Sequence, residues 1–144
     1  MDSDFAQCLK KQEALKEIFH EQLSSEERYL KIITFGKKLP PFPEEEKVEK
    51  NRVTGCQSLT YLSGYLQNQK MFFQAHSEAL LTKGLAYVVL YIYQEQSVET
   101  ILKCKPDFLN SLGILGSLSP TRAHGLKSFY NKLLNVSIKN LSLI

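Results

Sequence analysis

The sequence predicts a single α+β domain over residues 1–144, with a small antiparallel sheet of about three strands packed against helices. Segments near both ends of the chain carry apolar residues at helical spacing, whereas residues 53–75 alternate with a period of two and are rich in aromatic side chains. A chain of 144 residues with 43% hydrophobic composition is also long enough to bury one core. We therefore expect helices on both sides of a short central sheet.

The first helix is expected over residues 4–20. Its apolar positions recur three or four residues apart, which predicts one buried stripe on a surface helix. That stripe would consist of Phe5, Leu9, Ala14, Leu15, Ile18 and Phe19.

A second helix is expected to begin after Ser24 and to end near Leu39. Ser24 stands three positions before Glu27, which is the spacing of a capping box. Prolines follow Leu39 and cannot continue a helix. The next segment, residues 44–52, alternates in charge and predicts a solvated loop, with a border to a partner surface as the alternative.

The central segment predicts a hairpin. Residues 59–66 alternate with a period of two, Asn68-Gln69-Lys70 is suited to a tight loop, and residues 71–75 form a returning strand. Both strands are apolar on both faces, so helices are expected to cover at least one face.

Helices are expected again after the hairpin. Ser77 is predicted to cap a helix that continues through Tyr93, and Gly84 inside it indicates close packing against the sheet. Shorter helices are expected over residues 98–102 and 106–112, followed by breaks at two glycines. Ser119 and Pro120 predict the start of a terminal helix. Its apolar face would carry Leu126, Phe129, Tyr130 and Leu133.

Composition and charge exclude several classes of function. The net charge of +3 is too small to imply binding to nucleic acid. The most apolar stretch, residues 85–93, is about half the length of a membrane-spanning helix. The N-terminus opens with acidic residues rather than the basic start of a secretory signal. These features predict a cytoplasmic chain with no membrane partner.

Many motifs of enzyme chemistry are missing from the sequence. It contains no phosphate-binding loop, no dinucleotide-binding glycine pattern and no Cys-x-x-Cys pair. His20, His76 and His124 are isolated, so the pattern predicts no metal site. Cys8 and Cys104 are interpreted as small apolar or semi-exposed residues. An odd, scattered set of three cysteines is a poor disulfide framework and favours a reducing compartment.

Cys56 stands in a different setting. It follows Gly55, which permits a tight turn that would place the cysteine at the tip of a loop. Lys50 and Arg52 lie upstream, and positive charge favours the thiolate over the thiol. From these residues alone, Cys56 is either a nucleophile or a core cysteine at the start of a strand.

The run Val53-Thr54-Gly55-Cys56-Gln57-Ser58, followed by Tyr61, resembles the active-cysteine loop of the SufE family, the sulfur acceptors of cysteine desulfurases. Other segments resemble the same family in the same order, so that the likeness covers about residues 26–135. These segments are Arg28-Tyr29-Leu30, Gly36-Lys37-Lys38-Leu39-Pro40, Ser77 with Lys83-Gly84-Leu85, and Leu118-Ser119-Pro120-Thr121-Arg122 with Gly125.

The resemblance implies a SufE or U-type scaffold-like fold and a sulfur relay. Cys56 would take sulfur from a SufS-like, pyridoxal-phosphate-dependent desulfurase, carry it as a persulfide, and pass it to a SufBCD-like iron–sulfur scaffold. Gly55, Gln57 and Arg122 would support Cys56. Arg122 would hold the loop or stabilise the thiolate, with a helix-start salt bridge as the alternative.

The same resemblance implies a desulfurase activator rather than a stand-alone enzyme. The chain would hold no cofactor or metal of its own, because the pyridoxal phosphate belongs to the desulfurase. It could also pair with a second copy of itself.

The sequence departs from the family at two positions. Tyr61 stands where the family commonly has tryptophan, and His76 stands where it often has an acid. Two other functions stay open on the residues alone. One is a U-type scaffold that binds a cluster, which needs several cysteine ligands close together. The other is a cysteine hydrolase that uses Cys56 with His76 or His124.

Overall fold

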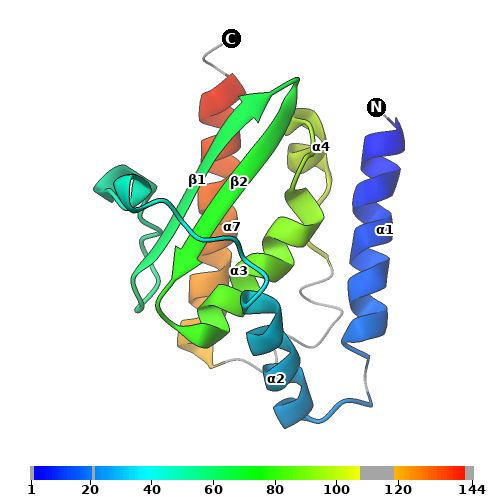
Figure 1. Ribbon diagram of the computed structural model, residues 1–144. Helices are drawn as coiled ribbons and strands as arrows, with labels where there is room; N and C mark the ends of the chain where they lie inside the picture. Colours follow the sequence, from blue (N-terminus) through cyan, green and yellow to red (C-terminus); the bar gives the residue numbers. More distant parts are fainter. Residues whose placement is uncertain (1, 21, 108–118, 142–144) are drawn as a thin grey trace.

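The computed structural model describes residues 2–20, 22–107 and 119–141. The predicted α+β class is confirmed, with helices packed against one antiparallel hairpin (Figure 1). The predicted helix over residues 106–112 and the glycine breaks after it fall almost wholly outside the described residues. In chain order the elements are α1 (Asp2–Ile18), α2 (Ser25–Gly36), η1 (Glu44–Glu46), η2 (Glu49–Asn51), β1 (Thr60–Gln67), β2 (Lys70–Ser77), α3 (Leu80–Tyr93), α4 (Val98–Lys103) and α7 (Pro120–Leu141).

The hairpin pairs β1 with β2 in antiparallel register, from Thr60 opposite Ser77 to Gln67 opposite Lys70. The predicted turn is confirmed and uses two residues with positive φ, at 52° and 65°, which suits the right-handed twist of the strands.

The expected third strand is absent from the described chain. Arg52 bridges Tyr61 on one side of the hairpin, and Gln96 bridges Met71 on the other, each as an isolated pair. A single bridge does not propagate into a ladder, so the described sheet has two strands.

Helices α3 and α7 cover one face of the hairpin, as expected (Figure 1). Alternate residues of β2 are buried, which directs one row of side chains into the core. The core is formed where this row meets apolar side chains of the two helices. It includes Leu62, Met71, Phe73, Leu85, Val89, Ile92, Leu126, Phe129 and Leu133.

The predicted capping box at α2 is confirmed. The Glu27 N–H donates to the Ser24 hydroxyl at 3.1 Å, and the Ser24 N–H donates to the Glu27 carboxylate at 2.9 Å. The helix ends at Gly36, before the prolines, and crosses α3 at Gly84. A Cβ added at Gly84 would overlap the backbone of Ile32, so Gly84 permits close helix–helix packing. The expectation of helix–sheet packing at Gly84 was wrong.

Two other local predictions need correction. Helix α3 begins at Leu80 after Ala79, and Ser77 is instead the last residue of β2. In α1 the buried face differs from the expected stripe. Phe5 and Leu9, which were expected to be buried, are exposed by 38% and 46%. The buried face of α1 is formed by Cys8, Gln12 and Leu15, with Phe19 directly after the helix.

The charged segment before Cys56 is more ordered than a solvated loop. It forms η1 and η2, and the buried Asn51 side chain donates to the carbonyl of Glu46 at 2.7 Å. Lys132 of α7 donates to the carbonyl of Lys50 at 2.6 Å. The segment is thereby fastened to α7 directly before the cysteine loop.

The remaining helix starts agree with the sequence. Ser97 caps α4 by accepting from the N–H of Thr100 at 3.1 Å. The hydroxyl of Ser119 accepts from the N–H of Arg122 at 3.3 Å, and Pro120 is the first residue of α7. Within the described ranges, no helix has the length and apolar character needed to cross a bilayer.

Candidate functional site

Cys56 lies in the loop between η2 and β1, where the chain passes the first turns of α7. Gly55 has φ of +95°, a conformation that favours glycine. A Cβ at Gly55 would collide with the side chain of Ser128 and would lie 3.3 Å from Nε2 of His124. The predicted tight turn is confirmed, and it allows the backbone of the loop to pack closely against α7.

The sulfur of Cys56 faces a second glycine. Its thiol donates to the carbonyl of Gly125 at 3.5 Å, and the side chain is half-buried. A Cβ at Gly125 would lie 3.4 Å from Sγ, which is ordinary van der Waals contact. The absence of a side chain at Gly125 therefore leaves free volume beside the sulfur. The sequence marks Gly125 only as part of a segment that resembles the family, and no pattern in the sequence predicts its contact with Cys56.

A pocket of about 240 Å³ opens beside the sulfur and collects most of the predicted site residues. It brings Cys56 and Gln57 together with Arg122, which stands 66 positions later than Cys56 in the chain. Gly55 shapes the loop from outside the pocket. The residues that line the pocket are Cys56, Gln57, Ser58, Ala79, Thr82, Leu85, Thr121, Arg122, Gly125 and Leu126.

Arg122 is held by a hydrogen bond from α3, and no ion pair of Arg122 with another described residue is found. Its Nη1 donates to the hydroxyl of Thr82 at 3.1 Å across the pocket. Thr82 could not be identified from the sequence, because a threonine on an apolar helix carries no motif. Only the packing of α3 against α7 brings the two residues together.

Burial raises the pKa of the Cys56 thiol above its ordinary value, and a hydrogen bond with the Thr60 hydroxyl offsets part of this effect. The expectation that Lys50 and Arg52 favour the thiolate was wrong. Both side chains are exposed, and the backbone of Arg52 pairs with Tyr61. The raised pKa favours the thiol form of Cys56 over the thiolate.

Three hydroxyl groups meet where the cysteine loop joins the hairpin. The Thr60 hydroxyl is 3.0 Å from that of Ser77, and the Ser58 hydroxyl is 3.4 Å from each of them. These contacts connect Ser58, at the end of the loop, to Thr60 and Ser77, which form the first pair of the hairpin. They thereby help to fix the position of the loop that carries Cys56.

The two histidines considered for a hydrolase do not line the Cys56 pocket. His76 lies on β2 with its ring 6.2 Å from that of Phe42, and burial is the main cause that lowers its pKa. His124 lies beside Gly55.

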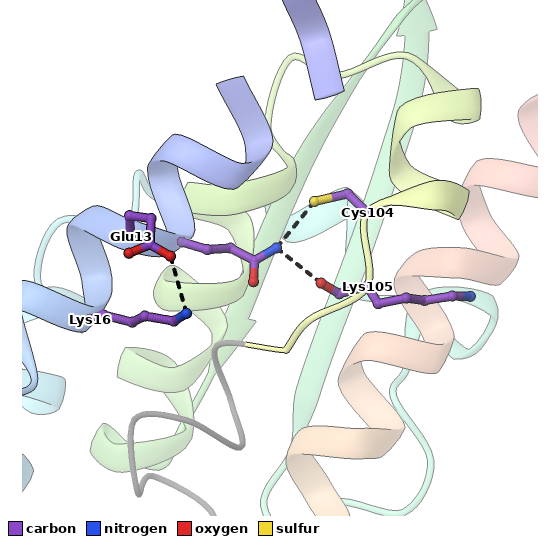
Figure 2. A network of polar contacts seen from close by, with 5 residues as sticks. Glu13, Lys16, Cys104 and Lys105 are labelled. Atoms are coloured by element: carbon purple, nitrogen blue, oxygen red, sulfur yellow. Dashed lines mark hydrogen bonds and ion pairs between the residues drawn. The ribbon is translucent and has the colours of Figure 1, made fainter. Parts of the chain in front are cut away.

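Cys8 and Cys104 lie away from the pocket, and the prediction that the cysteines form no disulfide was wrong for this pair. They are joined to each other, with a sequence separation of 96, and both are fully buried. Figure 2 shows Cys104 and the carbonyl of Lys105 as acceptors of one side-chain amide, which belongs to Gln12, at 3.1 and 2.9 Å. Their proximity arises because α1 folds back along α4, which no local pattern in the sequence shows.

A U-type cluster site would need cysteine ligands beside Cys56, and the structure instead pairs the other two with each other. Among the described residues, no group of three or more His, Cys, Asp or Glu side chains is arranged to hold a metal ion.

Comparison with known proteins identifies the family. The profile "SufE: Fe-S metabolism associated domain" matches residues 13–136. The chain is 36% identical to the uncharacterized SufE-like protein slr1419 of Synechocystis over 80% of this chain and 70% of that protein. It is also 36% identical to the cysteine desulfuration protein SufE of Wigglesworthia glossinidia brevipalpis, over 72% of this chain and 73% of the relative.

Other relatives are longer, and the fold has a solved counterpart. The match spans only 36% of SufE-like protein 1, chloroplastic/mitochondrial, of Arabidopsis thaliana. The solution structure of a hypothetical protein from Thermus thermophilus aligns with a TM-score of 0.76 at 25% identity, covering 92% of this chain and 96% of that one. The chain belongs to the SufE family.

Proposed function

We propose that this chain is a sulfur-transfer accessory protein whose Cys56 accepts sulfur from a pyridoxal-phosphate-dependent cysteine desulfurase. The observation that carries the proposal is the setting of Cys56. It is the free cysteine of the described chain, half-buried, and it opens on a pocket shared with Gln57 and Arg122. The name of the Wigglesworthia relative, a cysteine desulfuration protein, supports the same role.

The transfer is a thiol–disulfide type of exchange. The Cys56 thiolate attacks the outer sulfur of a persulfide on the desulfurase. A new S–S bond forms at Cys56, the S–S bond of the desulfurase breaks, and the electron pair leaves with the desulfurase thiolate. The proton released by Cys56 balances the one that the leaving thiolate takes up, so the step needs no oxidant or reductant.

The raised pKa of Cys56 fits a carrier that is idle until it is docked. The thiolate is the attacking species, so burial keeps the isolated chain slow to react and slow to oxidise. Contact with the desulfurase would have to supply the missing activation, through a nearby base or a change in the exposure of the loop. The rate of uptake then depends on docking, which protects the sulfur from side reactions.

The cofactor and the final acceptor belong to other proteins in this proposal. The desulfurase holds the pyridoxal phosphate, and the Cys56 persulfide delivers its sulfur to iron–sulfur assembly on a SufBCD-like scaffold in the cytoplasm. Removing the persulfide from the desulfurase frees that enzyme for another cycle. The chain therefore acts as a desulfurase activator.

Desulfurase turnover tests this role. Alanine formed from cysteine is measured with the desulfurase alone, with the wild-type chain, and with Cys56→Ser. We expect the wild type to raise turnover severalfold and Cys56→Ser to give none of this increase. The double variant Cys8→Ala/Cys104→Ala, which retains Cys56, serves as the matched control and should still stimulate. Equal stimulation by wild type and Cys56→Ser would refute the proposal.

A further inference from the structure

The polar wall of the Cys56 pocket carries a positive charge that is not among the causes of the pKa shift of the thiol. Of the described residues that line the pocket, Arg122 alone is a cation. Burial and the Thr60 hydrogen bond are what shift the pKa of Cys56, and burial dominates. The guanidinium is held across the pocket by Thr82, at 3.1 Å.

Loading a sulfur changes which atom carries the charge. A persulfide is a stronger acid than the thiol from which it forms, so its outer sulfur is anionic over more of the neutral pH range. That sulfur lies one S–S bond, about 2.05 Å, beyond Sγ. The Gly125 side of the pocket leaves room beside Sγ, whereas Ala79, Leu85 and Leu126 give the pocket apolar walls. An anion there needs a counter-charge, because apolar surroundings penalise an unpaired charge.

We propose that Arg122 is the counter-ion of the Cys56 persulfide anion and that Thr82 is the positioning residue that holds Arg122 over the pocket. The inference rests on the proposed function, since it assigns the sulfur-loaded state of the same site. It distinguishes two states of one cysteine. In the resting state, burial has the larger effect on the ionisation of the thiol, whereas in the loaded state the guanidinium stabilises the anion of the persulfide.

The hydroxyl of Thr82 has a definite task in this arrangement. Arg122 is an exposed side chain with many rotamers, and confining it to one of them costs conformational entropy. A hydrogen bond from α3 offsets part of this cost before the sulfur arrives. Thr82→Val keeps the shape of the side chain and removes the hydroxyl, whereas Thr82→Ser keeps the hydroxyl.

The experiment makes the persulfide without the desulfurase. Cys56 is first converted to a mixed disulfide with an aromatic thiol. Sulfide then displaces the aromatic thiolate and leaves Cys56–S–SH, with atoms and electrons balanced. The rate at which iodoacetamide alkylates the persulfide is followed against pH by intact mass, and the same profile is recorded for the unmodified thiol. The variants are Arg122→Gln, Thr82→Val and Thr82→Ser, and Lys127→Gln is the control that removes a charge from α7 outside the pocket.

We expect Arg122→Gln to raise the midpoint of the persulfide profile by about one pH unit. At pH values below the midpoint, the anionic fraction of the persulfide should then be about tenfold lower than in the wild type. Thr82→Val should move it in the same direction by about threefold, and Thr82→Ser and Lys127→Gln should match the wild type. The thiol profile should stay in place in every variant, and thermal unfolding should show that each is folded. A persulfide midpoint that does not move in Arg122→Gln would overturn the inference, and so would equal shifts of the thiol and persulfide profiles.

Loading by the desulfurase separates this inference from the function on which it rests. If the wild type gains sulfur from the desulfurase while all persulfide midpoints coincide, the pairing with Arg122 is wrong and the sulfur-acceptor role stands. If the midpoints shift as expected while the desulfurase never loads Cys56, the pairing stands and the role is wrong.

Discussion

Two glycines on either side of Cys56 govern where its sulfur lies. Gly55 supplies a positive φ that carries the loop flat against α7, and Gly125 leaves space beside Sγ. The first is needed for the backbone and the second for the reacting atom. Substitutions at the two positions should therefore affect different properties.

Gly125→Ala should slow sulfur uptake without harming the fold. The new methyl group would lie 3.4 Å from Sγ, so the thiol still fits but a second sulfur is crowded. Alanine is also favoured over glycine in a helix by about 1 kcal/mol. We expect the loading of Cys56 by the desulfurase to slow about tenfold, measured by quenched time courses of intact mass. Loading at the wild-type rate would show that this space is not used.

The pH dependence of Cys56 alkylation should show the effect of burial. Because burial raises the pKa of the thiol, the thiolate fraction is small at neutral pH and the rate climbs as pH rises toward a midpoint above the ordinary value. Thr60→Val removes the hydrogen bond that lowers this pKa, so its midpoint should lie higher than that of the wild type. Rates of iodoacetamide modification between about pH 7 and 10 measure both. A midpoint in Thr60→Val at or below that of the wild type would contradict this account.

At the scale of elements, a disulfide fastens α1 to the end of α4. Cys8 and Cys104 are both fully buried, and their link closes a loop with a sequence separation of 96. A cross-link over about 100 residues stabilises a fold by roughly 3–5 kcal/mol, mainly through the unfolded state. The link holds α1 in place independently of the sulfur chemistry at Cys56.

Cys8→Ala/Cys104→Ala should accordingly lower the free energy of unfolding by about 3–5 kcal/mol in urea titrations. Added reductant should lower it similarly in the wild type and leave the double variant unchanged. Thiol titration of the denatured wild type, prepared without reductant, should find one free thiol. Three free thiols would contradict the link between Cys8 and Cys104.

The crossing of α2 and α3 gives another prediction at this scale. A Cβ at Gly84 would overlap the backbone of Ile32, which a rigid helix cannot move aside. We expect Gly84→Ala to reduce the free energy of unfolding by about 1–3 kcal/mol. Gly125→Ala is the matched control, since it adds the same methyl group to a helix where there is room. If both variants gained stability, the close crossing of α2 and α3 at Gly84 would be contradicted.

For the whole molecule, the features that could be predicted from the sequence are those encoded by neighbouring residues. Ser24 with Glu27 forms the expected capping box, and Ser119 caps α7. The turn at Asn68 and the tight loop at Gly55 need backbone conformations that local composition reveals. The α+β class follows from these short-range patterns.

The features that were missed arise from contacts between distant segments. The Cys8–Cys104 disulfide depends on α1 folding back along α4, and Gly84 meets α2 rather than the sheet. In the candidate site, Thr82 reaches Arg122 only because α3 packs on α7. The charges at Lys50 and Arg52 point to a thiolate in the sequence, but partial burial of the Cys56 side chain raises the pKa of the thiol.

The most direct test of Cys56 as the sulfur acceptor is the mass of the chain after incubation with a cysteine desulfurase and cysteine. We expect the wild type to gain the mass of one sulfur atom, located at Cys56 by peptide mapping after alkylation, and Cys8→Ala/Cys104→Ala to gain the same. Cys56→Ser should gain none. A wild-type chain that gains no sulfur, or a Cys56→Ser chain that still does, would contradict the assignment of Cys56 as the sulfur acceptor.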